Sequence, residues 1–154
     1  MLSPTNHNTM KRLLVVLLFV AVAVTLPSAE ESKTASSPSV AKDSRAFEMR
    51  TYYAFPGKLE ALNARFRDHT CRLFKKHAME IVGFWIPTEK EQGAENKLVY
   101  ILAHKSREAA KKSFADFGKD PEWQKARAES EADGKLVEKV ESVFMSATDY
   151  SPMK

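Results

Sequence analysis

The chain has 154 residues, a formal net charge of +4 and a single cysteine, Cys71. One cysteine excludes an intrachain disulfide, and so mild a charge gives no reason to expect nucleic acid or a membrane surface as the partner. Once the N-terminal leader is set aside, about one domain of ordinary size remains.

The N-terminus carries a basic pair followed by an apolar run. Lys11 and Arg12 precede the apolar residues 13–26, and this pattern is typical of a secretory signal peptide. The run is shorter than the roughly 20 residues that a membrane span needs. We expect residues 1–29 to be a signal peptide, with Met10 as the alternative start, and the processed protein to be periplasmic or secreted. An uncleaved leader that anchors the protein in a membrane is the alternative; after cleavage no stable span is expected.

Residues 30–45 are rich in Ser, Ala and Lys, a composition that predicts a disordered linker. The folded domain is expected at residues 46–154. Its first element is a strand at 47–53, where apolar and polar side chains alternate before Pro56-Gly57.

Residues 58–77 contain neither Gly nor Pro and predict one amphipathic helix. Its apolar stripe has spacings of three and four residues: Leu59, Leu62, Phe66, His69 and Leu73. Arg65 falls on the flank that is expected to face water. Two β-branched and aromatic segments follow, at 80–86 and 98–104, and they predict a pair of strands joined by a polar loop.

The second half of the domain predicts two helices and a last strand. Ser106 can cap a helix that ends at Gly118. Asp120-Pro121 is typical of the start of another helix, and Gly134 stands where its C-terminal cap is expected. A fourth strand is predicted at 140–145.

The resulting order, β-α-β-β-α-β, predicts an α+β fold of the ferredoxin-like kind, with an antiparallel four-stranded sheet and helices on one face. In this fold the first and third strands are central. The third strand is apolar on both faces, and the helices can cover only one of them. We therefore expect a homodimer in which two sheets pack face to face.

Several segments resemble the NIPSNAP family: Phe47–Tyr52 with Pro56–Leu59, Asp120–Gln124, and Ser130–Gly134. The resemblance spans about residues 46–152. It implies a dimeric α/β barrel and no established catalytic residue or cofactor. Ala78 stands where the family often has Gly, and Cys71 where an apolar residue is usual. Members in animals resemble mitochondrial adaptor proteins, a role that this leader does not support.

Glu48, Arg50 and Tyr52 share one face of the first strand. If that face looks into the space between two sheets, Arg50 is either the partner of a structural ion pair with Glu48 or a grip for a carboxylate ligand. Strand alternation adds three further candidate ligand-binding residues to this cavity: Trp85, Tyr100 and His104.

His69 is the candidate catalytic residue, because an imidazole suits proton transfer near neutral pH. The alternative is a buried structural imidazole on the apolar stripe. His69 and His77 are eight residues apart, roughly 12 Å along a helix, so both cannot bind one ion from that helix. No metal site is predicted.

Two functions remain open. The first is an exported, non-enzymatic, dimeric binding or adaptor protein, with a small molecule or another protein as its ligand. The alternative is a monooxygenase-like enzyme of the dimeric α/β-barrel group that uses the cavity with His69, Arg50 or Tyr52. An RNA-binding domain is set aside because the third strand offers only Tyr100 for stacking.

Overall fold

The computed structural model describes residues 39–154. The expected signal peptide, residues 1–29, and the linker up to residue 38 lie outside the described residues. Within the described part, none of the helices combines the length and the apolar character that a membrane crossing requires.

Four strands form one antiparallel sheet: β1 (Ala46–Ala54), β2 (Glu80–Trp85), β3 (Lys97–His104) and β4 (Val137–Ser146). Their order is β2-β3-β1-β4, and every neighbouring pair is antiparallel. The central places of β1 and β3 confirm the predicted ferredoxin-like α+β fold. A short 3-10 turn, η2 (Lys90–Gln92), lies in the loop between β2 and β3.

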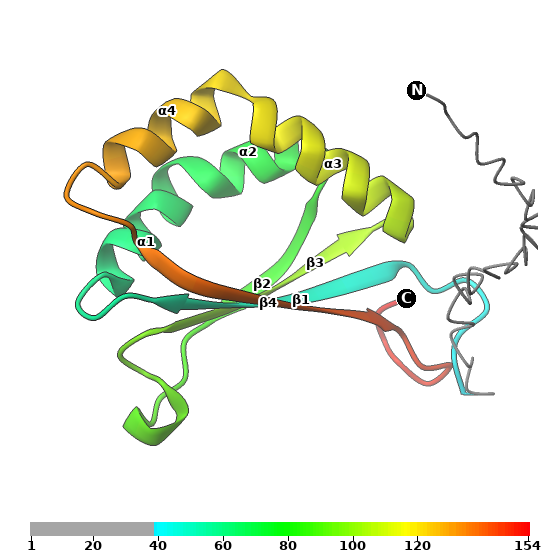
Figure 1. Cartoon of the computed structure of the whole chain (residues 1–154). Helices are drawn as coiled ribbons and strands as arrows, with labels where there is room; N and C mark the ends of the chain where they lie inside the picture. Colours follow the sequence, from blue (N-terminus) through cyan, green and yellow to red (C-terminus); the bar gives the residue numbers. More distant parts are fainter. Residues whose placement is uncertain (1–38) are drawn as a thin grey trace, which may run out of the picture. The chain divides into compact units, whose positions relative to one another are not determined.

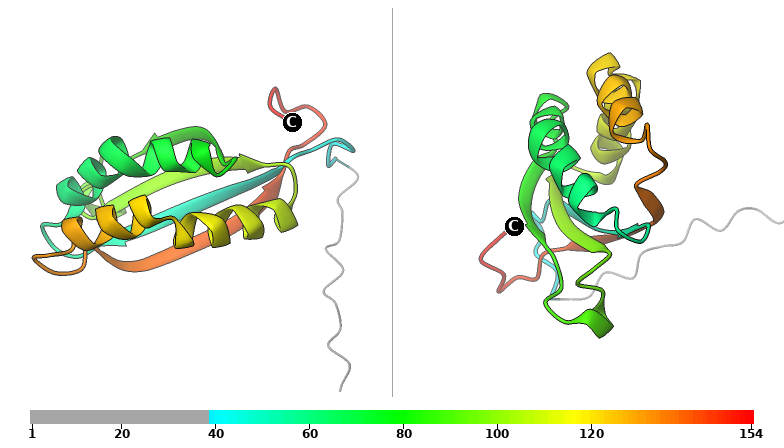
Figure 2. Two further views of the ribbon diagram at one scale, coloured as in Figure 1. Left: turned by 90° about the horizontal axis from the view of Figure 1, so that it is seen from above. Right: turned by 90° about the vertical axis from the view of Figure 1, so that its left-hand side faces the viewer.

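Both crossovers run over the same face of the sheet (Figure 1). The first consists of α1 (Leu59–Arg65), a π-helical turn η1 (Phe66–Thr70) and α2 (Cys71–Lys76). The second consists of α3 (Arg107–Lys119) and α4 (Pro121–Ser130). The two crossovers lie side by side above the strands (Figure 2), so no helix within residues 39–154 covers the other face of the sheet.

The π-helical turn interrupts the single α-helix that the sequence predicts. The backbone N–H of Cys71 donates to the carbonyl of Phe66, five residues earlier, and the Thr70 hydroxyl donates to the carbonyl of Arg65 at 3.2 Å. A π turn accommodates one more residue than an α turn. Thr70 therefore takes the buried position, and the residue before it moves to the flank.

The first crossover ends in a Schellman motif. The N–H of Met79 donates to Phe74 O at 2.9 Å, and that of Ala78 donates to Lys75 O at 3.2 Å. Met79 and Phe74 are both buried, which is the apolar contact that usually accompanies this motif. Ala78 consequently has a positive φ of 56°, a conformation that suits glycine better than alanine.

The helix N-caps of the second crossover are the residues that the sequence predicts. Ser106 Oγ accepts from the Ala109 N–H at 3.1 Å, and Asp120 Oδ1 accepts from the Glu122 N–H at 2.9 Å. Two boundaries differ from the prediction. The helix that was expected to end at Gly118 continues to Lys119, and α4 ends at Ser130, before Gly134.

The main core lies between the sheet and the helices. Tyr100, at the middle of β3, is fully buried, and its ring centroid lies 5.3 Å from those of both Phe66 and Phe84. Around these rings pack Leu62, Leu73, Phe74, Met79, Leu98, Leu102, Phe117 and Leu136.

The face of the sheet without helices is also apolar, and we call it the open face. Strand register and packing place apolar side chains there, among them Phe47, Met49, Val82, Trp85, Ile101, Val143 and Met145. Val143 and Trp85 are each 49% exposed. A cavity of about 280 Å³ lies between Phe47, Val82, Ile101 and Met145 and the C-terminal segment that follows β4.

Part of the expected linker is ordered. Val40 forms an antiparallel bridge with Thr148, and the Ala41 N–H donates to Ala147 O at 3.0 Å. Ser44 Oγ accepts from the Ala147 N–H at 2.6 Å. The domain therefore begins before residue 46, because the segment that follows β4 offers backbone partners to residues 39–44.

Candidate functional site

A buried carboxylate, that of Glu48, lies at the centre of the candidate site. Its Oε1 accepts from Arg50 Nη1 at 2.5 Å and from the Ser142 hydroxyl at 2.6 Å, and its Oε2 lies 3.3 Å from His104 Nε2. The register of the sheet explains this cluster. Arg50 is opposite Ser142 on β4, and His104 lies at the end of β3, on the other side of β1. We call these four residues the Glu48 cluster.

The guanidinium of Arg50 lies between aromatic rings. Its Cζ is 4.5 Å from the ring centroid of Phe114 on α3 and 5.7 Å from that of Tyr52, a favourable position for a cation over a π face. Two polar atoms of the cluster, Arg50 Nε and His104 Nδ1, are buried and have no hydrogen-bond partner among the described residues.

The electrostatics of the Glu48 cluster keep its carboxylate ionised. Burial alone would raise the pKa of Glu48, but hydrogen bonds from His104 and Ser142 and the charge of Arg50 outweigh burial and lower that pKa. At Tyr100 burial is the largest effect, and the charge of Arg50 opposes it without cancelling it, so the pKa of Tyr100 is raised well above its usual value. Tyr100 is therefore a neutral phenol that fills the core.

The Glu48 cluster does not face a space between two sheets. Glu48, Arg50 and Tyr52 point toward the helices of their own chain, since Arg50 contacts Phe114 and Tyr52 packs against Phe66 at 5.6 Å between ring centroids. The expectation that this face would line a dimer cavity is wrong. Both faces of the sheet are apolar, so alternation alone did not show which one the helices cover.

The structure brings five of the six candidate ligand-binding residues to the helix-covered face: Glu48, Arg50, Tyr52, Tyr100 and His104. Trp85 does not join them. It is opposite Val99 in the register, whereas its neighbour Phe84 is opposite Tyr100, so Trp85 points to the open face. Its indole lies over Gly83, where an added Cβ would approach the ring to 2.8 Å.

His69, the candidate general base, is exposed and is not buried on the apolar stripe. The π-helical turn is the reason, because the extra residue gives the buried position to Thr70. His69 instead lines a surface depression of about 280 Å³ between the first crossover and α4.

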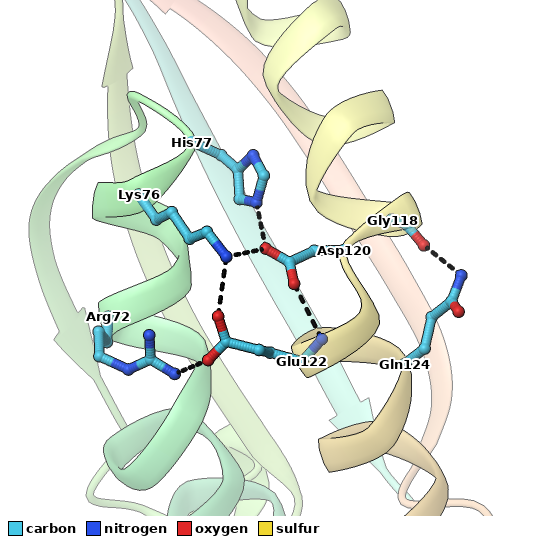
Figure 3. Close-up of polar contacts among 7 residues, drawn as sticks. All are labelled: Arg72, Lys76, His77, Gly118, Asp120, Glu122 and Gln124. Atoms are coloured by element: carbon cyan, nitrogen blue, oxygen red, sulfur yellow. Dashed lines mark hydrogen bonds and ion pairs between the residues drawn. The ribbon is translucent and has the colours of Figure 1, made fainter.

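A second polar network was not predicted from the sequence. Asp120 Oδ2, at the start of α4, lies 2.7 Å from His77 Nε2 and 2.9 Å from Lys76 Nζ. Glu122 continues the network to Lys76 at 2.8 Å and to Arg72 at 2.5 Å (Figure 3). These contacts join α2 to α4. The sequence does contain the parts of this network, an Asp-Pro helix start and a basic helix end, but it does not show that the two ends meet in the fold.

Arg65 was expected on a wet flank, and this expectation is wrong. Its side chain is only 4% exposed and forms an ion pair with Glu131 at 2.9 Å. Its Cζ also lies 5.3 Å from the ring centroid of Trp123 on α4. The buried arginine thus ties α1 to the end of α4.

Metal ligands do not cluster in the described part of the chain, since residues 39–154 contain no group of three or more His, Cys, Asp or Glu side chains arranged to hold an ion. The Glu48 cluster contributes one carboxylate and one imidazole, and that carboxylate is already engaged by Arg50 and Ser142.

The profile of the NIPSNAP family matches residues 47–152, which is most of the chain. The chain belongs to the NIPSNAP family. Among curated proteins, none is similar enough to count as a match.

Solved structures of other NIPSNAP proteins share the fold. A family member of unknown function from Agrobacterium tumefaciens strain C58 is 25% identical, with a TM-score of 0.64 over 75% of this chain and 98% of that one. An uncharacterised NIPSNAP domain protein from Burkholderia xenovorans is 22% identical, with a TM-score of 0.58 over 70% of this chain and 98% of that one. A cofactor-independent oxygenase from Streptomyces nogalater is 16% identical, with a TM-score of 0.46, a likeness too weak to bear on activity.

The segments that resemble the NIPSNAP family have a structural role in this domain. Asp120 and Pro121 begin α4, and Trp123 packs on Phe117 with 4.5 Å between ring centroids. At the other end of α4, Glu131 binds Arg65, and Gly134 has a φ of 107°. Both segments therefore fix α4 against the rest of the domain.

Proposed function

We propose that this NIPSNAP domain is an exported, non-enzymatic homodimer, formed by packing the open faces of two copies together, and that it acts as a binding or adaptor protein. The apolar open face is the observation that carries the proposal. Export is supported by the basic pair and apolar run at the N-terminus.

The open face needs a cover because the half of it around Phe47 is apolar and continuous, whereas the other half carries Tyr53, Lys139 and Glu141. Phe47, Ile101 and Met145 lie on adjacent strands and pack together, and Val143 and Trp85 extend the surface outward. Contiguous apolar patches of this kind on soluble proteins usually mark an interaction site. A second copy supplies a complementary surface by two-fold symmetry.

The enzymatic alternative receives less support from the geometry. Its candidate residues lie apart, since His69 is on the outer surface of the helical layer and Arg50 lies against the sheet beneath Phe114. Glu48, the buried carboxylate, is engaged by three side chains. Paired in this way, the charges satisfy one another in the interior.

Two valines of β4 allow a matched test of the dimer. Val143 is on the open face and is 49% exposed, whereas Val140 is opposite Tyr52 on the helix side and is 40% exposed. Both can accept a lysine without burying it. We expect the processed protein to be a dimer by light scattering, Val143→Lys to be a folded monomer, and Val140→Lys to remain a dimer.

The dimer proposal fails if the unmodified processed protein is a folded monomer at micromolar concentration or above. It also fails if Val143→Lys and Val140→Lys have the same mass in solution. Export is tested separately by N-terminal sequencing of the protein recovered from the cell envelope or the medium, and an intact leader there would contradict processing.

A further inference from the structure

The groove between α4 and β4 has the features of a ligand site. It encloses about 340 Å³, and its lining includes Tyr52, Trp123, Arg127, Lys135 and Val140. We propose that this groove binds a small aromatic carboxylate. The inference deepens the proposed binding role by naming a ligand class, and it does not depend on the dimer.

The floor of the groove is aromatic and rigidly held. Tyr52 lies 5.6 Å from Phe66 and 5.4 Å from Tyr100 between ring centroids, and Trp123 lies 4.5 Å from Phe117. Because these rings are fixed by the core, a planar ligand would stack on them with little loss of side-chain freedom.

The rim of the groove is positively charged. Four cationic and two acidic side chains line it: Arg65, Arg127, Lys135 and Lys139 against Glu131 and Glu138. Lys139 is paired outside the groove with Glu141 at 2.5 Å, so the excess is one positive charge. One of the acids is already neutralised, because Glu131 pairs with Arg65 at 2.9 Å and with Arg127 at 3.3 Å. An anionic ligand is therefore favoured over a neutral or cationic one.

Two donors of the groove are not used by the protein itself. Lys135 is exposed and has no ion-pair partner in the described part of the chain. Arg65 lines the wall with a side chain that is 4% exposed, and its buried Nε–H has no acceptor among the described residues. A buried donor without an acceptor is uncommon, but Nε is inaccessible from the groove in this conformation, so a carboxylate oxygen would supply the acceptor only after the Arg65 side chain shifts.

The size and position of the groove favour a small molecule. Ligand pockets usually measure about 300–1,000 Å³, so this groove suits one or two fused rings rather than a long polymer. It lies on the helix side of β4, since Val140 is opposite Tyr52. The open face is on the other side of that strand, so the two sites do not compete.

The test is a calorimetric titration of the processed protein with 2-naphthoate, and with 2-naphthamide as the uncharged ligand of the same shape. We expect 2-naphthoate to bind once per chain, and 2-naphthamide to bind about tenfold more weakly because it lacks the charge. Val140→Trp should abolish binding by filling the groove.

Two lysines, one in the lining of the groove and one outside it, provide a matched pair. Lys135→Glu should weaken 2-naphthoate binding by about two- to fivefold, as expected for an exposed charge. Lys125→Glu makes the same charge change outside the groove, on a residue paired with Glu129, and should leave the affinity unchanged.

Four results would overturn the proposal. They are the absence of saturable 2-naphthoate binding, equal affinity for 2-naphthamide, equal effects of Lys135→Glu and Lys125→Glu, and binding that survives Val140→Trp. The first of these contradicts the proposal even if an acidic peptide binds the groove instead. Val143→Lys should bind 2-naphthoate with unchanged affinity, so failure of the dimer and failure of the groove are separate outcomes.

Discussion

His77 Nε2 lies 2.7 Å from Asp120 Oδ2, and this contact joins the C-terminal end of α2 to the residue that caps α4. Lys76 approaches the same oxygen at 2.9 Å. Hydrogen bonds from Lys76 and His77 lower the pKa of Asp120 well below its ordinary value. The two crossovers are therefore held together by a carboxylate that stays ionised in the folded protein.

Asp120→Asn should lower the melting temperature by several degrees at neutral pH. Asparagine still caps a helix, so the loss reports the charge and not the cap. Because folding lowers the pKa of Asp120 below 3.8, its contribution is present above that pH and is lost as the pH falls further. Thermal unfolding by circular dichroism should show the two proteins converging in acid. Asp116→Asn, which breaks a pair with Lys112 within one helix, should have a smaller effect.

Ala78→Gly should stabilise the domain by about 0.5–1 kcal/mol. Glycine avoids the cost of the left-handed conformation, and this gain exceeds the destabilisation that comes from its greater freedom in the unfolded chain. Ala78 has a φ of 56° at the Schellman end of α2. Urea unfolding measures the difference. The reverse substitution is the control: Gly134 has a φ of 107°, so Gly134→Ala should destabilise the domain by about 1 kcal/mol or more. A less stable Ala78→Gly protein would contradict the strain argument.

Glu48→Gln should destabilise the domain by about 2–3 kcal/mol, because it leaves the mostly buried guanidinium of Arg50 without a counter-charge. Ser142→Ala removes one hydrogen bond of the same carboxylate and should cost only about 1 kcal/mol. The pKa of Glu48 is lowered from 4.5 by folding, so its contribution should be present above that pH and decline in acid. Equal stability of Glu48→Gln and the unmodified protein in urea would show that the Arg50 pair is unimportant.

His69→Ala should change the free energy of unfolding by less than about 0.5 kcal/mol, as for other exposed positions. Thr70→Ala should cost about 1–2 kcal/mol, because Thr70 is buried and its hydroxyl binds the carbonyl of Arg65. Urea unfolding of the two variants compares neighbouring residues of one helical turn. The opposite order would mean that the π turn does not persist in solution.

The sheet and its strand order could be predicted because the apolar pattern, the turn residues and the helix caps all indicated the same order of strands and helices. Pro56-Gly57 and Asp120-Pro121 marked element boundaries by backbone geometry alone. The two apolar faces of β3 correctly indicated that the sheet has an open face as well as a helix-covered one.

The candidate site was harder to predict because it depends on which face the helices cover. Glu48 and Arg50 were assigned to a space between two sheets, yet they form their pair beneath the helices of their own chain, where Ser142 and His104 also bind Glu48. His69 is exposed because of the π turn, and a helix predicted from a period of 3.6 residues does not include such a turn.

The bridge between Val40 and Thr148 brings the two ends of the domain to one corner of the sheet. A tether attached at residue 39 would therefore join the domain at the same corner at which its C-terminal segment begins. A short peptide could close the chain into a ring there, and new ends could be opened in the loop near Gly93 without cutting a strand.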